Sequence, residues 1–167
     1  MKLTEKTAMK DIFALVELMT EDQCREASEW ATKVLRKKWH ELTIWEANEC
    51  MQGDFAVIGV EGNDMLNCLA SQYFWAWGFA QVFMPQYVKS CESLIVPPTI
   101  EEQEAAEGLI SCSWYESQIV FTQKYFGLKD FNEAEKITLD QLLVARKAMY
   151  NEGMFQRKLF EIQRRKK

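Results

Sequence analysis

The sequence predicts an all-α protein, a single domain over residues 1–167 in which five to seven helices pack around a buried central helix near residues 65–84. The composition, 48% hydrophobic and 27% charged, is typical of a folded globular chain. Only seven glycines and three prolines occur in 167 residues, which leaves few signals for the many turns of a β protein. Long helices are therefore favoured over many short strands.

Helix starts are marked four times by the pattern Thr-x-x-Glu/Gln, at Thr20, Thr43, Thr99 and Thr138. In such a capping box the threonine hydroxyl accepts from the third backbone N–H, and the Glu or Gln side chain accepts from the N–H of the threonine. One match carries little weight because these residues are common. Four matches, each ahead of an amphipathic stretch, predict four helix N-termini.

The first part of the chain is predicted to form three helices. Apolar residues at helical spacing predict a helix over 7–19 and a second over 21–39. A shorter third helix is expected over 44–52, ended by Gly53 in a left-handed cap. Residues 55–60 break the helical pattern and are expected to form a short strand or a buried loop.

The second part contains the apolar helix and two further long ones. The apolar helix is predicted over 65–84, with Pro85 ending or kinking it. After the sequence VPPT, a long helix is expected over 100–126, and the last helix follows Thr138 to the C-terminus. Its basic part, 141–167, is expected to project from the domain.

The uncharged stretch SQYFWAWGFAQVFMPQYV, residues 71–88, has three interpretations. The uncharged window 65–88 is long enough for a membrane span, but it contains several polar residues and no basic cluster flanks it. A ligand pocket would need convergent charged groups, which the stretch lacks. Because apolar residues occupy both sides of the helix, we expect it to be the core of the fold.

Some of this aromatic surface is nevertheless expected to contact a partner, because Tyr and Trp are common at interfaces. The sequence also places acidic residues at the start of the predicted helix over 100–126. The candidate partner surface therefore consists of Tyr73, Trp75, Trp77, Glu101, Glu102 and Glu104.

No residue pattern indicates catalysis, a metal or a cofactor, so we expect a protein that is not an enzyme. Glycine-rich phosphate loops, nucleophile elbows and kinase motifs are missing from the sequence. His40 is the single histidine, and the five cysteines are scattered without metal-ligand spacing. An odd number of scattered cysteines favours a cytoplasmic protein with reduced thiols.

Charge is distributed unevenly along the chain. Residues 41–120 carry 12 acidic groups and one lysine, whereas 121–167 carry 11 basic and 6 acidic groups. The acidic part could face a basic partner. The basic C-terminal helix could bind phosphates, and the residues that would do so are Arg146, Lys147, Arg157, Lys158, Arg164, Arg165, Lys166 and Lys167. Tyr150, Phe155 and Phe160 interleave with them and are interpreted as the packed face of that helix.

The order of sequence features in residues 36–73 resembles that of a known group of proteins. These residues run from a basic helix end through LTIWE to a short helix closed by Gly53, a second glycine, and a helix that reaches Tyr73. This order resembles small all-helical accessory proteins of phages and mobile elements from gut Bacteroidota, often found near DNA-replication genes. The resemblance implies a helical accessory protein in the cytoplasm of a bacterial host cell and assigns no role to any residue.

The function predicted from these observations is a non-enzymatic accessory protein that binds another protein. Its partner would be a component of DNA replication or a bacterial defence component that it inhibits, and a second copy of the chain is a further candidate. Nucleic-acid binding by the basic C-terminal helix is the first alternative. A phage structural or assembly protein is the second.

Overall fold

The computed structural model describes residues 3–4, 6–9, 13–59 and 68–165, and in this part of the chain it is all-helical, as predicted. When α4, the π turn η4 and α5 are counted as one continuous helix, the described residues form eight α-helices, of which five have at least seven residues. None of the helices in the described ranges is both long enough and apolar enough to cross a membrane.

The first helices differ from the prediction in their lengths. Within the predicted range 7–19, the described α-helix is α1 (Phe13–Val16), and residues 10–12 lie outside the described ones. Helix α2 (Glu21–Leu35) begins at the predicted capping box of Thr20 and ends four residues earlier than predicted. Arg36 ends it with a left-handed backbone (φ 53°), and the 3-10 turn η2 (Trp39–Glu41) follows.

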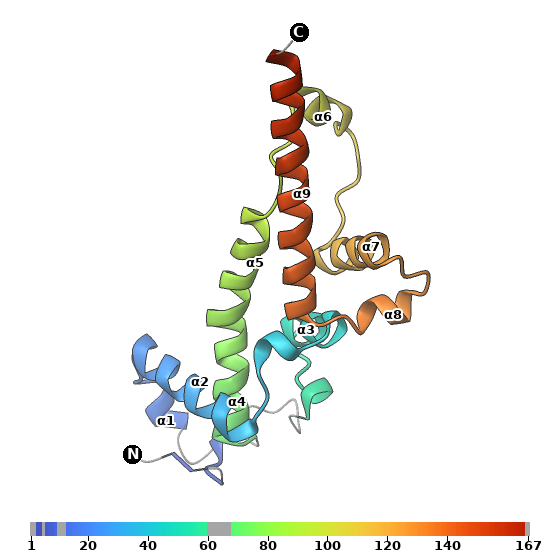
Figure 1. Ribbon diagram of the computed structural model, residues 1–167. Helices are drawn as coiled ribbons and strands as arrows, with labels where there is room; N and C mark the ends of the chain where they lie inside the picture. Colours follow the sequence, from blue (N-terminus) through green and yellow to red (C-terminus); the bar gives the residue numbers. More distant parts are fainter. Residues whose placement is uncertain (1–2, 5, 10–12, 60–67, 166–167) are drawn as a thin grey trace.

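The apolar helix is confirmed as the centre of the fold, but its predicted end was wrong. It comprises α4 (Ala70–Gly78), the π-helical turn η4 (Phe79–Phe83) and α5 (Met84–Ser93), drawn as one green helix in Figure 1. Its predicted first residues, 65–67, lie outside the described residues. In η4 the N–H of Met84 donates to the carbonyl of Phe79, five residues earlier. This change of hydrogen-bonding register immediately precedes Pro85, which lacks an N–H, and the helix continues through the proline.

Helices α3 (Ile44–Met51) and α9 (Leu139–Arg165) begin side by side. The Ile44 N–H donates to the Ile137 carbonyl at 2.9 Å and the Leu139 N–H to the Leu42 carbonyl at 2.8 Å. The two bonds form an isolated antiparallel bridge between Thr43 and Thr138, and each threonine also caps its own helix. Two of the predicted capping boxes therefore lie against each other.

Residues after α3 form a short turn. Gly53 has φ 91° and follows the end of α3, as expected. The 3-10 turn η3 (Ala56–Ile58) occupies the described part of the segment predicted as a strand or buried loop, and no strand forms there. Residue 60 lies outside the described residues.

The predicted helix over 100–126 was wrong, because it is two helices. α6 (Ile100–Ala105) and α7 (Trp114–Phe126) are separated by a connection in which Gly108 has φ 81°. A fifth capping box starts α7, where the Ser113 hydroxyl accepts from the Glu116 N–H and the Ser113 N–H donates to the Glu116 carboxylate. α8 (Phe131–Glu135) follows α7.

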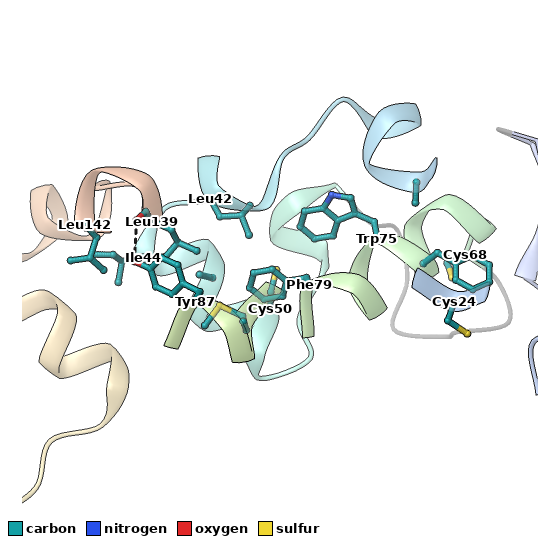
Figure 2. Packing of buried hydrophobic residues seen from close by; sticks show 14 of the residues in the cluster. Cys24, Leu42, Ile44, Cys50, Cys68, Trp75, Phe79, Tyr87, Leu139 and Leu142 are labelled. Carbon is teal, nitrogen blue, oxygen red and sulfur yellow. Dashed lines mark hydrogen bonds between the residues drawn. The ribbon is translucent and has the colours of Figure 1, made fainter. Parts of the chain in front are cut away.

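The core lies along α4, η4 and α5. Trp75 and Phe79 of this helix are completely buried (Figure 2). Other buried side chains come from α2, α3, α7, α8, the first turns of α9, and the connecting segments that carry Met9, Leu42 and Cys68. A close approach of α2 needs Gly78, because a Cβ there would lie 2.6 Å from the Cβ of Ser28 and 2.7 Å from Cζ2 of Trp39. The glycine in this predicted core helix is thus a packing requirement.

Helix α9 extends beyond the core. It runs without a break through the sequence NEG at 151–153 and reaches past the end of α5, where α6 lies beside it (Figure 1). Its buried residues are Leu139, Leu142 and Ala145, all in its first two turns. The rest of α9 therefore offers most of its side chains to solvent.

Candidate interaction surfaces

The aromatic part of the predicted partner surface lies mainly in the core. Trp75 is completely buried and its indole N–H donates to the Lys37 carbonyl at 2.7 Å, so its assignment to a partner surface was wrong. Tyr73 and Trp77 are partly buried against the core, and the Tyr73 ring meets Phe74 edge-on. The error has a physical cause: α2 covers this side of α4 closely, which only the glycine at position 78 permits.

The aromatic residues of the central helix stack on one another. Rings at positions 75, 79, 83 and 87 follow at intervals of four residues, with centroid separations of 5.9, 6.0 and 5.6 Å. Residues four apart share a helix face, so this order follows from helical geometry. The stack forms the aromatic part of the core along α4, η4 and α5.

The acidic part of the predicted partner surface is exposed. All residues from Pro97 to Ser113 are exposed, including Glu101, Glu102 and Glu104. We call residues 97–113 the exposed segment. Three large apolar residues, Ile100, Leu109 and Ile110, are 73, 74 and 95% exposed within it.

Local contacts hold the exposed segment against α9. The capping box of Thr99 starts α6, and the Thr99 N–H donates to the Glu102 carboxylate at 2.7 Å. This bond, with a smaller effect from nearby Arg157, lowers the pKa of Glu102. Glu102 also forms an ion pair with Arg157 of α9 at 3.5 Å.

Two hollows lie between α9 and the chain that follows α5. An open groove of about 530 Å³ is lined by Val96, Pro98, Glu102, Met149, Glu152, Gly153 and Arg157. A smaller pocket of about 230 Å³ is lined by Leu94, Ile95, Val96, Phe121, Arg146, Met149 and Tyr150. In the groove, Val96 approaches Gly153 so closely that a Cβ there would lie 2.9 Å from Cγ2 of Val96.

The predicted phosphate-binding residues are not equivalent. Arg146 donates to Gln118 at 2.7 Å and stacks over the Phe121 ring, Arg157 pairs with Glu102, and Arg164 lies over the Phe160 ring. The remaining described residues of this set are exposed and form no ion pair with any described residue. They are Lys147, Lys158 and Arg165. Lys166 and Lys167 lie outside the described residues.

An apolar stripe on α9 was missed by the sequence interpretation. Phe155 and Phe160, which were interpreted as packed, are 62 and 60% exposed. Phe155 shares one face with Val144, Leu159 and Ile162, which are also exposed, and we call these four residues the α9 stripe. This face lies opposite the buried Leu139 and Leu142. The spacing of 11, 4 and 3 residues between members of the stripe is the sequence signal that could have revealed it.

Burial changes the pKa of several ionisable groups in the core. Burial raises the pKa of the Cys50 thiol to about 12 and raises that of Cys91. Burial also raises the pKa of Tyr87, whose hydroxyl donates to the Leu139 carbonyl. No three acidic, cysteine or histidine side chains in the described ranges gather closely enough to hold a metal ion.

Comparisons with protein-family models, with curated proteins and with solved structures find no match to this chain.

Proposed function

We propose that the protein is a non-enzymatic accessory protein that binds another protein through the exposed segment, residues 97–113. The observation that carries the proposal is the exposure of Ile100, Leu109 and Ile110 in one short segment outside the core. Several large apolar side chains that lie in one short segment and are not used by the core indicate an interaction site. The resemblance to helical accessory proteins of phages and mobile elements points the same way.

The residues of the exposed segment indicate what kind of partner surface would fit it. Four glutamates, Glu101, Glu102, Glu104 and Glu107, accompany the three apolar residues, and Glu102 alone among them is paired with a described basic residue, Arg157. A partner that fits would offer an apolar hollow bordered by lysine or arginine side chains. The apolar contacts would supply most of the affinity, and the charges would speed association and select the partner.

Photo-crosslinking in cells that naturally carry the chain tests the proposal. A photoreactive residue at Ile110 is expected to form an adduct with one discrete protein, and the same residue at the exposed Lys129, in the turn before α8, is the matched control. Adding Glu101→Lys and Glu104→Lys should remove the adduct without changing the melting temperature, because both side chains are exposed. Equal adducts at positions 110 and 129, or an adduct unaffected by charge reversal, would contradict the proposal.

Nucleic-acid binding by α9 is a second candidate, favoured by the three exposed cations Lys147, Lys158 and Arg165, which lie on one side of the helix. Phosphate binding should weaken steeply as salt rises, in proportion to the number of phosphates contacted. A salt titration with short DNA and RNA duplexes measures this slope. Replacing the three residues with glutamine should flatten it, and an unchanged slope would exclude this side of α9.

A further inference from the structure

We propose that the α9 stripe is the interface with a second copy of this chain, in which two α9 helices pack in parallel as a two-stranded coiled coil. The stripe runs from Val144 to Ile162, which is about 27 Å along the helix axis at 1.5 Å per residue. All four of its apolar side chains are exposed in the single chain. The buried face of α9 lies on the opposite side, so a second helix can reach the stripe without disturbing the core.

The spacing of the stripe fits a coiled-coil seam. Ala148, Phe155 and Ile162 recur every seven residues as a positions, and Val144, Asn151, Lys158 and Arg165 recur every seven residues as d positions, so Leu159 of the stripe flanks the seam at an e position. This is the alternation of a and d positions that keeps one face of a helix toward a partner. Asn151, at a d position, would meet the Asn151 of the second copy, and this polar pair in the seam lowers the stability of the dimer.

Charge complementarity on either side of the seam favours a second copy in parallel orientation. In a parallel pair, the residue before each a position faces the residue five positions later in the partner. Lys147 would then face Glu152 of the second copy, and Met154 would face Leu159, so the described flanking positions form one ion pair and one apolar contact on each side. Lys147 and Glu152 are exposed and neither forms an ion pair with a described residue of its own chain.

Lys158 and Arg165 also lie at d positions of this seam. Their long aliphatic stems can cover the apolar residues while the charged ends reach water at the edges of the seam. In a parallel pair each of them would face its own copy, and this like-charge repulsion limits the strength of association, so we expect a dimer that dissociates on dilution. Dimerisation would place two copies of the exposed segment on one assembly, which raises the avidity for a partner that has more than one binding site.

The oligomeric state of the full chain over a concentration series tests the interface by analytical ultracentrifugation. The wild type is expected to dimerise, and Phe155→Ser with Ile162→Ser should leave a monomer at every concentration with an unchanged helical spectrum. Val120→Ser is the matched control, because Val120 is an exposed apolar residue of a different helix, α7. A wild type that stays monomeric at its highest soluble concentration, or a dimer that survives the double substitution, overturns the proposal.

Charge exchange tests the orientation. Lys147→Glu alone and Glu152→Lys alone should each raise the dissociation constant, roughly two- to tenfold for two exposed ion pairs. The double variant should return it to the wild-type value. Rescue by the double variant is expected only when the two residues face each other across the dimer, and its failure overturns the parallel arrangement.

Cross-linking tests the parallel orientation of the two α9 helices independently. In a Cys112→Ser background, which removes the described exposed thiol, Ile162→Cys should form a disulfide-linked dimer on oxidation. Position 162 meets its own copy in a parallel pair and lies far from it in an antiparallel one. Absence of the Ile162→Cys cross-link in a chain that dimerises contradicts the parallel arrangement. None of these outcomes bears on the exposed segment, so the two proposals stand or fall separately.

Discussion

The indole N–H of Trp75 donates to the backbone carbonyl of Lys37 at 2.7 Å, and this bond joins the central helix to the chain between α2 and η2. Trp75 is completely buried and stacks on Phe79 at an interplanar angle of 3°. One side chain therefore fills the core and also satisfies a polar group where the chain turns after Arg36. Such a buried bond is costly to lose because its acceptor is left without a partner.

Replacing Trp75 with Phe should lower the free energy of unfolding by about 1–3 kcal/mol, because the Lys37 carbonyl loses its donor. The smaller ring adds a packing loss. Urea unfolding measures the change. Trp45→Phe is the control, because Trp45 is 42% exposed and its substitution should stay within about 0.5 kcal/mol of wild type. Equal effects of the two substitutions would contradict the core role of Trp75.

Gly78→Ala should destabilise the protein, although alanine is normally the better helix former by about 1 kcal/mol. The added Cβ would lie 2.6 Å from the Cβ of Ser28, so α2 and α4 must move apart, which costs about 1–3 kcal/mol. Thermal unfolding checks the direction of the change.

Two further variants isolate the contact at Gly78. Ser28→Gly in the Gly78→Ala background removes the nearest atoms and should restore part of the stability, while Trp39 still crowds the site. Gly153→Ala is the helix comparison: a Cβ there would lie 2.9 Å from Cγ2 of Val96, which belongs to the loop between α5 and α6 and can shift, so the loss should be smaller than for Gly78→Ala. A melting temperature for Gly78→Ala at or above that of wild type would show that α2 and α4 are not in close contact.

Features of the fold that depend on residues close together in the sequence were predicted well. The four threonine capping boxes form as expected, because each depends on side chains three residues apart and on little else. The four threonine boxes do not mark the break between α6 and α7, which has a serine box instead: Ser113 and Glu116 have the same spacing. Gly108 was a second signal for this break.

Features that depend on distant contacts could not be predicted in this way. The burial of Trp75 depends on α2, which lies about 40 residues earlier in the chain, and helical spacing alone left both sides of the central helix equivalent. The exposure of Phe155 depends on how far α9 extends beyond the core. Of the candidate surfaces, the exposure of the glutamates could be expected from their charge. The α9 stripe could be recognised only once the packing of Leu139 and Leu142 had shown which side of α9 is buried.

The capping threonines should differ in their effect on global stability. Thr43→Ala removes the α3 cap next to the bridge with Thr138 and should lower the unfolding free energy by about 1 kcal/mol. Thr99→Ala removes the same kind of cap from α6, whose residues are all exposed, and should leave the global midpoint unchanged. Hydrogen exchange of the α6 amides should instead become faster. A global loss of stability in Thr99→Ala would contradict the peripheral position of α6.

Helix α6 should loosen at low pH. The hydrogen bond from the Thr99 N–H lowers the pKa of Glu102 below its ordinary value of 4.5, so the ionised carboxylate stabilises the folded helix. This contribution is present above pH 4.5 and is lost as the pH falls through the lowered pKa of Glu102. NMR Cα shifts of α6 should follow this transition. Glu102→Gln keeps the acceptor and should make α6 less sensitive to pH, and an equal pH response in both proteins would argue against the carboxylate as its source.

The cysteines should separate into one reactive thiol and several protected ones. Cys112 is exposed, whereas Cys24, Cys50, Cys68 and Cys91 are buried. With iodoacetamide at pH 8, mass spectrometry should find Cys112 modified first and the other four modified only after urea unfolds the chain. Rapid modification of Cys50 in the folded protein would contradict the packing of α3 against the core.

Burial of Cys50 also makes the fold sensitive to alkali. Because burial raises the pKa of its thiol from 9.0 to about 12, the unfolded chain loses this proton at a lower pH than the folded one. The stabilising contribution is complete below pH 9 and is lost as the pH rises from about 9 toward 12. Urea midpoints measured between pH 8 and pH 11 should therefore decrease. Cys50→Ala removes this group and should flatten the decrease, while Cys112→Ala, at the exposed position, should leave its slope as in the wild type.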